Sequence, residues 1–434
     1  MNRLPVSWPD SVTKVLAMLV EAGYEAYLVG GCVRDLLLGK PVHDYDLTTN
    51  ARPESVRVLF AHTLPTGMQH GTVTVILNGF PVEVTTFRRE SGYSDGRHPD
   101  AVDFHATLEQ DLARRDFTIN AMAIDAQGLL HDPYGGQQDL TRRLIRAVGN
   151  PAQRFAEDGL RIVRALRFAA VLEFRIDPAT YSAMIAQARR IDAVARERIG
   201  QEFRRIATGA WWTVSQELGH GPWLARVGES WRQLQEGFRH IPGSPRWKTL
   251  QERLEQSESW QTQAAVAALW CHLAGLNDAD VNQWLLGMAW ERPTRNLVRT
   301  SVRCLRLEPL QWGDQEWRQS LYEFGLMPVR NACIVLDSLD EMEPNEAYTY
   351  RAQDEPAEGG RIALFQQYCA TQPIWEMRDL AVSGQLIAGL GAVGPQIGQI
   401  LQRLVAAVLR GDAVNSRPEL LALAKLSVKE LSGT

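Results

Sequence analysis

The sequence predicts an α+β protein, with a mixed β-sheet head over residues 1–147 and an all-α remainder. Up to about residue 148, short apolar strands alternate with glycine turns. From Asn150 onwards, the pattern is that of helices separated by Gly, Pro and Asn. A chain of 434 residues, 45% of them hydrophobic, can bury a sizeable core and form two to four domains.

The head begins with an amphipathic helix predicted over residues 11–22, with Ser11 as its N-cap. A strand over 25–29 then leads into Gly30-Gly31 and a short helix over 33–38. The remaining strands of the head are predicted over 45–48, 73–77, 82–87, 121–125 and 129–131. The second and third of these flank Asn78-Gly79, a dipeptide that favours a two-residue hairpin turn.

The helical part divides into a neck over 148–209, a body over 210–370 and a tail over 371–434. Asn150 is the expected N-cap of the first neck helix, and Gln153 completes a predicted capping box. Eleven of the 13 tryptophans fall in the body, and we expect them to pack in a helical core rather than to stack on RNA bases. The acidic segment 341–361 is predicted to be a loop or linker.

The net charge of −5 argues against a uniformly basic nucleic-acid coat protein. Only five of the 46 basic residues are lysine, and arginine is the cation whose planar fork suits phosphates and bases. A compositional bias towards arginine explains the count equally well. Between residues 151 and 210, however, eleven arginines face seven acidic residues, so positive charge is concentrated in the neck.

Five scattered cysteines without a C-x-x-C spacing predict reduced thiols and a cytoplasmic protein. No targeting segment is visible, and no apolar run approaches the ~18 residues of a membrane span. No motif implies a protein partner.

Asp44 and Asp46 are the first chemical motif, because side chains at i and i+2 of a strand point the same way and can share divalent metal ions. Such a pair alone is better explained by a solvated sheet edge. Gly30, Gly31 and Arg34 precede it, and glycines at a helix start let the backbone approach phosphates. A phosphate cradle followed by a metal pair predicts nucleotidyl transfer.

Three further residues of the head are candidates for the same site. Glu83, in an alternating strand, is either a third catalytic carboxylate or a solvent-facing side chain, and the pattern favours neither. Arg115 either grips triphosphate oxygens or is a solvated charge. Asn120 holds a sugar hydroxyl or a turn.

The neck helix carries Asp158, Arg161, Arg164 and Arg167 on its polar side. In one continuous helix, Asp158 and Arg161 are neighbours, whereas Arg167 lies half a turn away from Asp158. A carboxylate can accept from the exocyclic amine of cytosine or adenine while a neighbouring guanidinium donates to the ring nitrogen, and such a pair would refuse uracil and guanine. The alternative is an i,i+3 surface ion pair.

Taken in order, these motifs resemble those of the class II tRNA nucleotidyltransferases, the CCA-adding enzymes and poly(A) polymerases of the polymerase-β superfamily. The resemblance spans about 27–206, returns weakly over 379–424, and rests on Val29–Asp35, Asp44–Asp46, Arg114–Asn120, Asp132–Gly136, Glu157–Arg161 and Glu197–Ile199 with Glu202. It implies a polymerase-β-like nucleotidyltransferase head, then neck, body and a tRNA-binding tail.

The resemblance also implies an activity: template-independent addition of C, C and A to the 3′ end of tRNA from CTP and ATP with Mg²⁺. It assigns metal binding to Asp44 and Asp46. Nucleotide binding falls to Gly31, Arg34 and Arg115, base recognition to Asp158 and Arg161, and completion of the nucleotide pocket to Arg164 and Arg167.

Several alternatives to a full CCA-adding enzyme remain open: an A-adding tRNA enzyme, a poly(A) polymerase and an inactive tRNA-binding protein. The loop 88–105, with Tyr93, Asp95, Arg97, His98 and Pro99, resembles the flexible loop of CCA-adding members and disfavours a CC-adding enzyme. The segment 197–199 favours the tRNA enzymes over poly(A) polymerase. Gly159 departs from helix-forming sequence, since glycine inside a helix costs ~1 kcal/mol relative to alanine.

Overall fold

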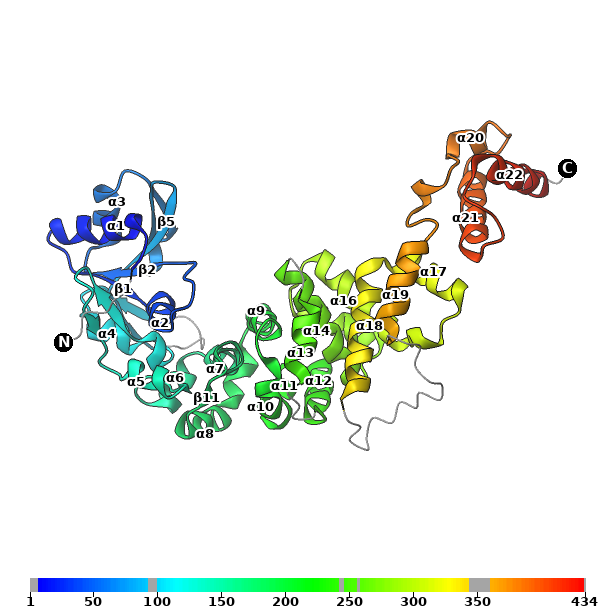
Figure 1. The fold of residues 1–434 in the computed structure, drawn as a ribbon. Helices are drawn as coiled ribbons and strands as arrows, with labels where there is room; N and C mark the ends of the chain where they lie inside the picture. Colours follow the sequence, from blue (N-terminus) through cyan, green and yellow to red (C-terminus); the bar gives the residue numbers. More distant parts are fainter. Residues whose placement is uncertain (1–6, 93–99, 242–245, 256–257, 343–359, 433–434) are drawn as a thin grey trace. The chain divides into compact units, whose positions relative to one another are not determined.

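The computed structural model describes residues 7–92, 100–241, 246–255, 258–342 and 360–432. These residues form two compact units (Figure 1). The first consists of residues up to 235 together with 287–289, and the second of 236–286 and 290 onwards. All residues predicted to carry chemistry lie in the first unit.

The head is built on a mixed sheet, as predicted. In the described part of the chain it has seven strands in the order β3-β4-β5-β2-β1-β8-β9. Their bounds are β1 Ala26–Val29, β2 Asp46–Thr49, β3 Thr63–Gly67, β4 Thr72–Leu77, β5 Phe80–Thr86, β8 Ala123–Asp125 and β9 Leu130–His131. Strands β2 and β5 pair in parallel and the other neighbours are antiparallel. Two small ribbons stand apart: β6 Arg89–Ser91 with β7 Ala101–Asp103, and β10 Leu144–Ile145 with β11 Arg175–Ile176.

The predicted hairpin between β4 and β5 is confirmed. Its turn residues, Asn78 and Gly79, both have positive φ (53° and 76°), as a two-residue hairpin turn requires. On both strands the valines are buried and alternate with more exposed residues, so one face of the hairpin packs into the core of the head.

Helices of the head cover the sheet and lead into the site. They are α1 Asp10–Glu21, α2 Gly31–Leu37, α3 Pro53–Leu59, α4 Leu108–Ala113 and α5 Gly136–Thr141. Helices α1 and α3 lie side by side and contact β4 and β5 (Figure 1). The predicted Ser11 cap is wrong: Pro9 occupies the N-cap position, and Ser11 is already helical and buried.

The neck contains α6 Pro151–Glu157, α7 Leu160–Leu172, α8 Pro178–Ala186 and α9 Arg196–Ala207. The Asn150 side chain accepts hydrogen bonds from the N–H groups of Ala152 and Gln153, which confirms the predicted cap. Gln153 makes no return contact to Asn150 in the part of the chain described, so the predicted capping box does not form.

The prediction of one continuous neck helix is wrong. Asp158 is extended (φ −147°, ψ 110°) and separates α6 from α7. Gly159 has an ordinary helical φ of −59°, so conformational freedom does not explain it. A Cβ on Gly159 would overlap the backbone carbonyl of Arg190, in the short 3₁₀ segment Ala188–Ala193. Glycine at this position therefore provides space for a close approach of two backbones.

The rest of the chain is helical, as predicted. Its helices are α10 Ser215–His220, α11 Leu224–Val227, α12 Glu229–Arg239, α13 Arg246–Leu254, α14 Ser259–Leu273, α15 Asp278–Gly287, α16 Arg292–Arg306, α17 Asp314–Phe324, α18 Leu326–Glu341, α19 Gly360–Thr371, α20 Gly384–Ala388, α21 Pro395–Arg410 and α22 Arg417–Ser432. Most of the tryptophans pack inside, as expected: Trp211, Trp223, Trp247, Trp270, Trp284 and Trp317 are among the largest fully buried side chains.

Two predicted loops fall partly outside the described residues, and the described part of the first, 88–105, contains the β6–β7 ribbon. Residues 93–99, with Tyr93, Asp95, Arg97, His98 and Pro99, are not described, and neither is most of the predicted linker, residues 343–359. Among the helices that the structure describes, none has the length and apolarity needed to cross a membrane.

Candidate active site

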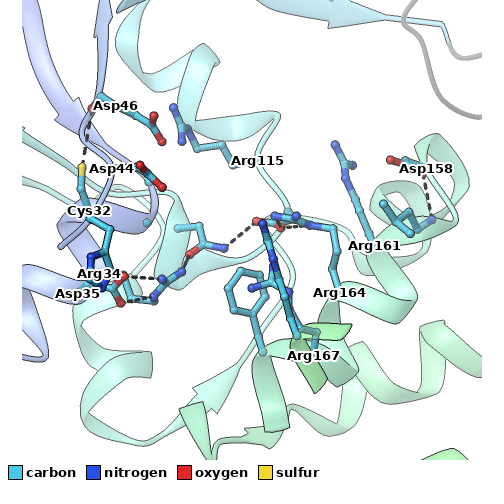
Figure 2. A pocket seen from close by; sticks show the side chains of 18 of the residues that line it. Cys32, Arg34, Asp35, Asp44, Asp46, Arg115, Asp158, Arg161, Arg164 and Arg167 are labelled. Carbon is cyan, nitrogen blue, oxygen red and sulfur yellow. Dashed lines mark hydrogen bonds and ion pairs between the residues drawn. The ribbon is translucent and has the colours of Figure 1, made fainter. Parts of the chain in front are cut away.

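A pocket of about 600 Å³ lies where the head meets the neck. Of the residues singled out from the sequence, all but Glu83 line it: Gly30, Gly31, Arg34, Asp44, Asp46, Arg115, Asn120, Asp158, Arg161, Arg164 and Arg167. Figure 2 shows Asp44, Asp46 and Arg115 on one side of this pocket and Asp158 and Arg161 on the other.

The carboxylates lie at the start of β2. Asp46 is its first residue, whereas Asp44 lies two positions before the strand, and both line the pocket. In the parallel pairing of β2 with β5, Glu83 is the register partner of Asp46. Burial, together with the charges of Glu83 and Asp44, raises the pKa of Asp46 to about 6, while Arg115 opposes the rise. Binding of a cation beside Asp46, in addition to the charge of Arg115, would therefore be favourable.

Glu83 stands beside this pair without joining the pocket. Its side chain is exposed, whereas Val82 and Val84 are buried, which matches the predicted alternation. Within the described residues, no three His, Cys, Asp or Glu side chains are grouped closely enough to hold a metal ion. The protein ligands of a divalent ion in this pocket would therefore be Asp44 and Asp46.

Arg115 lies over the glycine turn. Gly30 has φ 78°, and a Cβ on it would come within 2.8 Å of Nη1 of Arg115, so both its conformation and its surroundings require glycine. Nη2 of Arg115 donates to Asp111 at 3.3 Å. The buried Nε of Arg115 has no hydrogen-bond partner in the described part of the chain. The Arg115 guanidinium thus lies at the glycine turn and lines the pocket.

A chain of polar contacts connects the head to α7. Arg34 binds Asp35 through Nε and Nη2, at 2.9 and 2.8 Å, and its Nη1 donates to the Asn120 side chain at 2.7 Å. The Asn120 amide donates to Asp116 at 3.0 Å. Asp116 accepts from Arg164 at 2.8 and 2.5 Å. Asn120 therefore orients Arg34 and Asp116 relative to each other.

Charge pairing stabilises the buried members of this chain. Burial alone would raise the pKa of Asp116, but the charge of Arg164 and hydrogen bonds from Asn120 and Arg164 hold it well below its ordinary value. Further along α7, Arg167 donates to Glu202 at 2.6 Å. Burial lowers the pKa of Arg167 to about 10 despite this partner, and Arg164 adds to the fall.

The base-recognition pair is organised differently from the prediction. Asp158 accepts from Arg198 of α9 at 2.7 Å rather than pairing with Arg161. Arg161 forms an ion pair with Glu157, and its Nη2 donates to the carbonyl oxygen of Arg114 at 3.0 Å. Both side chains line the same pocket, but the break at Asp158 removes the i,i+3 contact that a continuous helix would give.

Asp116, Arg198 and Phe168 are among the pocket residues that received no role from the sequence. Asp116 and Arg164 are 48 positions apart, and Asp158 and Arg198 are 40 apart. No local pattern specifies such pairs. Phe168 falls within an apolar helical stripe, where a pocket side chain and a core side chain have the same periodicity.

Two family models match the first unit. Residues 26–146 match the Poly A polymerase head domain, and residues 173–217 match a model described as the probable RNA and SrmB-binding site of polymerase A. The first match covers the sheet with Asp44, Asp46 and Arg115. The second begins just after α7 and covers α8 and α9.

Similarity to characterised proteins extends over the full chain. A CCA-adding enzyme of Limosilactobacillus fermentum is 36% identical over 98% of both chains, and one of a Geobacillus species is 35% identical over 93% of both. The solved structure of the Bacillus stearothermophilus CCA-adding enzyme in complex with CTP matches with a TM-score of 0.78 and 28% identity, over 98% of both chains. A Thermotoga maritima CCA-adding enzyme complexed with tRNA shares the fold, with a TM-score of 0.61 at 20% identity over 96% of this chain and 94% of that one.

Proposed function

This chain belongs to the CCA-adding enzyme family, and we propose that it adds C, C and A in turn to the 3′ end of tRNA, using CTP and ATP and releasing pyrophosphate. One observation carries the proposal: a single pocket is lined by two carboxylates at the start of a strand, an arginine over a glycine turn, and an aspartate and an arginine suited to reading C and A. No template strand is needed, because the protein supplies the groups that read the base.

We propose that Asp44 and Asp46 hold Mg²⁺. Mg²⁺ usually keeps several waters and takes one or two carboxylates together with substrate phosphates, so these two side chains fit it. When bound, the metal would supply Lewis-acid stabilisation of phosphoryl oxygens and activation of the attacking 3′-hydroxyl. Glu83, opposite Asp46 across β2 and β5, adds negative charge beside the pair and is proposed as an auxiliary carboxylate.

The triphosphate is proposed to lie over Gly30 and Gly31. The glycine turn leaves room for phosphate oxygens, and the Arg115 guanidinium, which lies at this turn and lines the pocket, is a donor for them. Arg34 contributes a second guanidinium, oriented by Asp35 and Asn120. These cations neutralise charge that develops on the pyrophosphate as it leaves.

Base recognition is proposed to involve an exchange of partners. An incoming cytosine or adenine offers its exocyclic amine to Asp158 in place of Arg198, and its ring nitrogen to Arg161 in place of a backbone carbonyl. Arg164 and Arg167 complete the nucleotide pocket. Uracil or guanine would leave both side chains opposite groups of the wrong kind, and buried unpaired polar groups are costly.

We propose that residues 1–147 perform the chemistry, that the neck over 148–209 reads the base, and that the body over 210–370 and the tail over 371–434 bind tRNA. The five cysteines are all unpaired and four of them are buried, which suits the cytoplasm, where we place the protein.

The test uses three tRNAs, ending before the CCA, after the first C and after CC. Each is incubated with purified protein, Mg²⁺ and labelled CTP or ATP. We expect CTP to extend the first two substrates and ATP to extend the third. If CTP is never incorporated while ATP extends the third substrate, the protein adds only A. If neither nucleotide is incorporated, the proposed function fails.

A further inference from the structure

Phe168, on α7, lies at the centre of an unusual group of cations. Three guanidinium carbons surround its ring, at 3.6 Å from the centroid for Arg167, 5.2 Å for Arg34 and 5.5 Å for Arg164. All three fall within the ~6 Å over which an aromatic face attracts a cation, and the attraction is greatest where water is excluded. The ring is only 3% exposed and lines the pocket.

The cations around this ring come from two elements. Arg34 belongs to α2 of the head, whereas Arg164 and Arg167 belong to α7 of the neck, where Figure 2 shows them close together. Each has one carboxylate partner at 2.9 Å or less: Asp35, Asp116 and Glu202 respectively. Arg34 is connected to α7 by hydrogen bonds through Asn120 and Asp116. All three guanidiniums share a contact with the Phe168 ring.

The Phe168 ring also packs against a second aromatic ring. Phe117, which is fully buried, packs edge-on against Phe168, with the ring centroids 5.7 Å apart and the planes at 80°. Phe117 directly follows Asp116, the acceptor for Arg164. The orientation of the Phe168 face is therefore coupled to the same segment that orients Arg34 and Arg164.

We propose that Phe168 is a positioning residue for nucleotide addition. Its π face offsets the mutual repulsion of three closely spaced guanidiniums and holds Arg34, at the triphosphate end of the pocket, at a fixed distance from the arginines of α7, at the base end. This inference rests on the proposed function of the pocket. It predicts that the electron density of the ring matters, whereas a residue that only filled the core would depend on shape alone.

The test varies the ring without changing its shape. Mono-, di- and trifluorophenylalanine are introduced at position 168 of the full-length protein, because added fluorine weakens the negative face of the ring and leaves its size nearly unchanged. We expect kcat/KM for CTP and for ATP to fall at each step, by roughly tenfold or more in total, as three attractive contacts weaken. We expect most of the fall to come from a higher KM, because the displaced arginine side chains would bind the nucleotide less tightly.

Phe155 provides the matched control. It is fully buried on α6 of the same neck, and in the described residues no guanidinium lies over its ring. The same fluorinated series at Phe155 should leave kcat/KM within about twofold of the unmodified protein. If kcat/KM does not change across the fluorinated series at position 168, or falls equally at positions 168 and 155, the proposal is overturned.

A second variant pair keeps the inference testable if fluorinated protein is obtained in poor yield. Phe168→Leu should lower kcat/KM and raise the rate of UTP incorporation relative to CTP, and Phe168→Tyr should restore both. If Phe168→Leu matches the unmodified protein, the ring does no positioning. Addition of C and A by the unmodified protein is measured alongside, so failure of the proposed function is distinguished from failure of this inference.

Discussion

Asp44 is exposed, whereas the other carboxylates that line the pocket are half-buried or buried. Asp44→Asn should therefore leave the fold and tRNA binding unchanged while lowering kcat by at least ~1000-fold, because several kcal/mol of metal-dependent stabilisation are lost. The measurement is single-turnover incorporation of CTP, with tRNA affinity measured by filter binding.

Glu54→Gln on α3 is the matched control, since Glu54 is an exposed carboxylate of the head outside the pocket. It should retain full activity. Incorporation by Asp44→Asn at the unmodified rate would remove Asp44 from the metal site.

Arg161 is engaged by Glu157 and by two backbone carbonyl oxygens before any nucleotide arrives. Arg161→Ala should relax selection of C and A over U and G by ~10- to 100-fold, because one base contact contributes about 1–3 kcal/mol of discrimination. Competition between CTP and UTP at equal concentrations measures this ratio.

Arg154→Ala separates base reading from the local ion pair. Arg154 binds the same Glu157 at 2.5 Å but does not line the pocket. It should lower stability without changing the CTP-to-UTP ratio. Equal relaxation in both variants would mean that Arg161 acts only by holding Glu157.

At the scale of elements, the break between α6 and α7 sets the position of Asp158. Gly159→Ala should push the start of α7 away from the Arg190 carbonyl, costing about 1–3 kcal/mol of stability and weakening nucleotide selection. Urea unfolding measures the first effect and CTP against UTP competition the second.

Gly398 on α21 is the control glycine, because a Cβ there has open space around it and the position is helical. Gly398→Ala should raise stability by about 0.5–1 kcal/mol. If Gly159→Ala is as stable as Gly398→Ala, the close approach of Gly159 to the Arg190 carbonyl does not determine the break between α6 and α7.

The sequence predicts six strands and two helices of the head, because their signals are local, but not β3, α3, α4 or α5. The strand periodicity, the Asn78-Gly79 turn and the Asn150 cap each depend on a few neighbouring residues, and each forms as expected. The path of the neck at Asp158 depends instead on the backbone at Arg190, 32 positions from Asp158 along the chain. Periodicity carries no information about such contacts, so the pocket residues were predictable but their pairing was not.

At the scale of the whole molecule, ion pairs within the protein neutralise part of the positive charge of the neck arginines. The neck arginines with acidic partners are Arg154, Arg161, Arg164, Arg167 and Arg198. Arg205 lines the pocket, is exposed, and has no acidic partner in the described part of the chain. Phosphates of the tRNA end are its expected partners.

Affinity for tRNA should therefore fall steeply with salt, and Arg205→Gln should reduce the slope of log K against log salt by about 0.8, the amount for one lost phosphate contact. Arg175→Gln, an exposed position of the same neck on β11 and outside the pocket, should leave the slope unchanged. Equal slopes for both variants would place the tRNA end elsewhere.

The short segment Gly287–Ala289 belongs to the first unit although both of its flanks belong to the second, so the chain passes between the units three times. A Cβ on Gly200 of α9 would overlap the carbonyl of Met288, so these backbones are closely fitted. For recombination between relatives, the two units are therefore not separable modules. A hybrid joined once, after residue 235, would bring the Met288 backbone of one parent against the α9 helix of the other, and a compatible exchange must transfer this tripeptide together with the first unit.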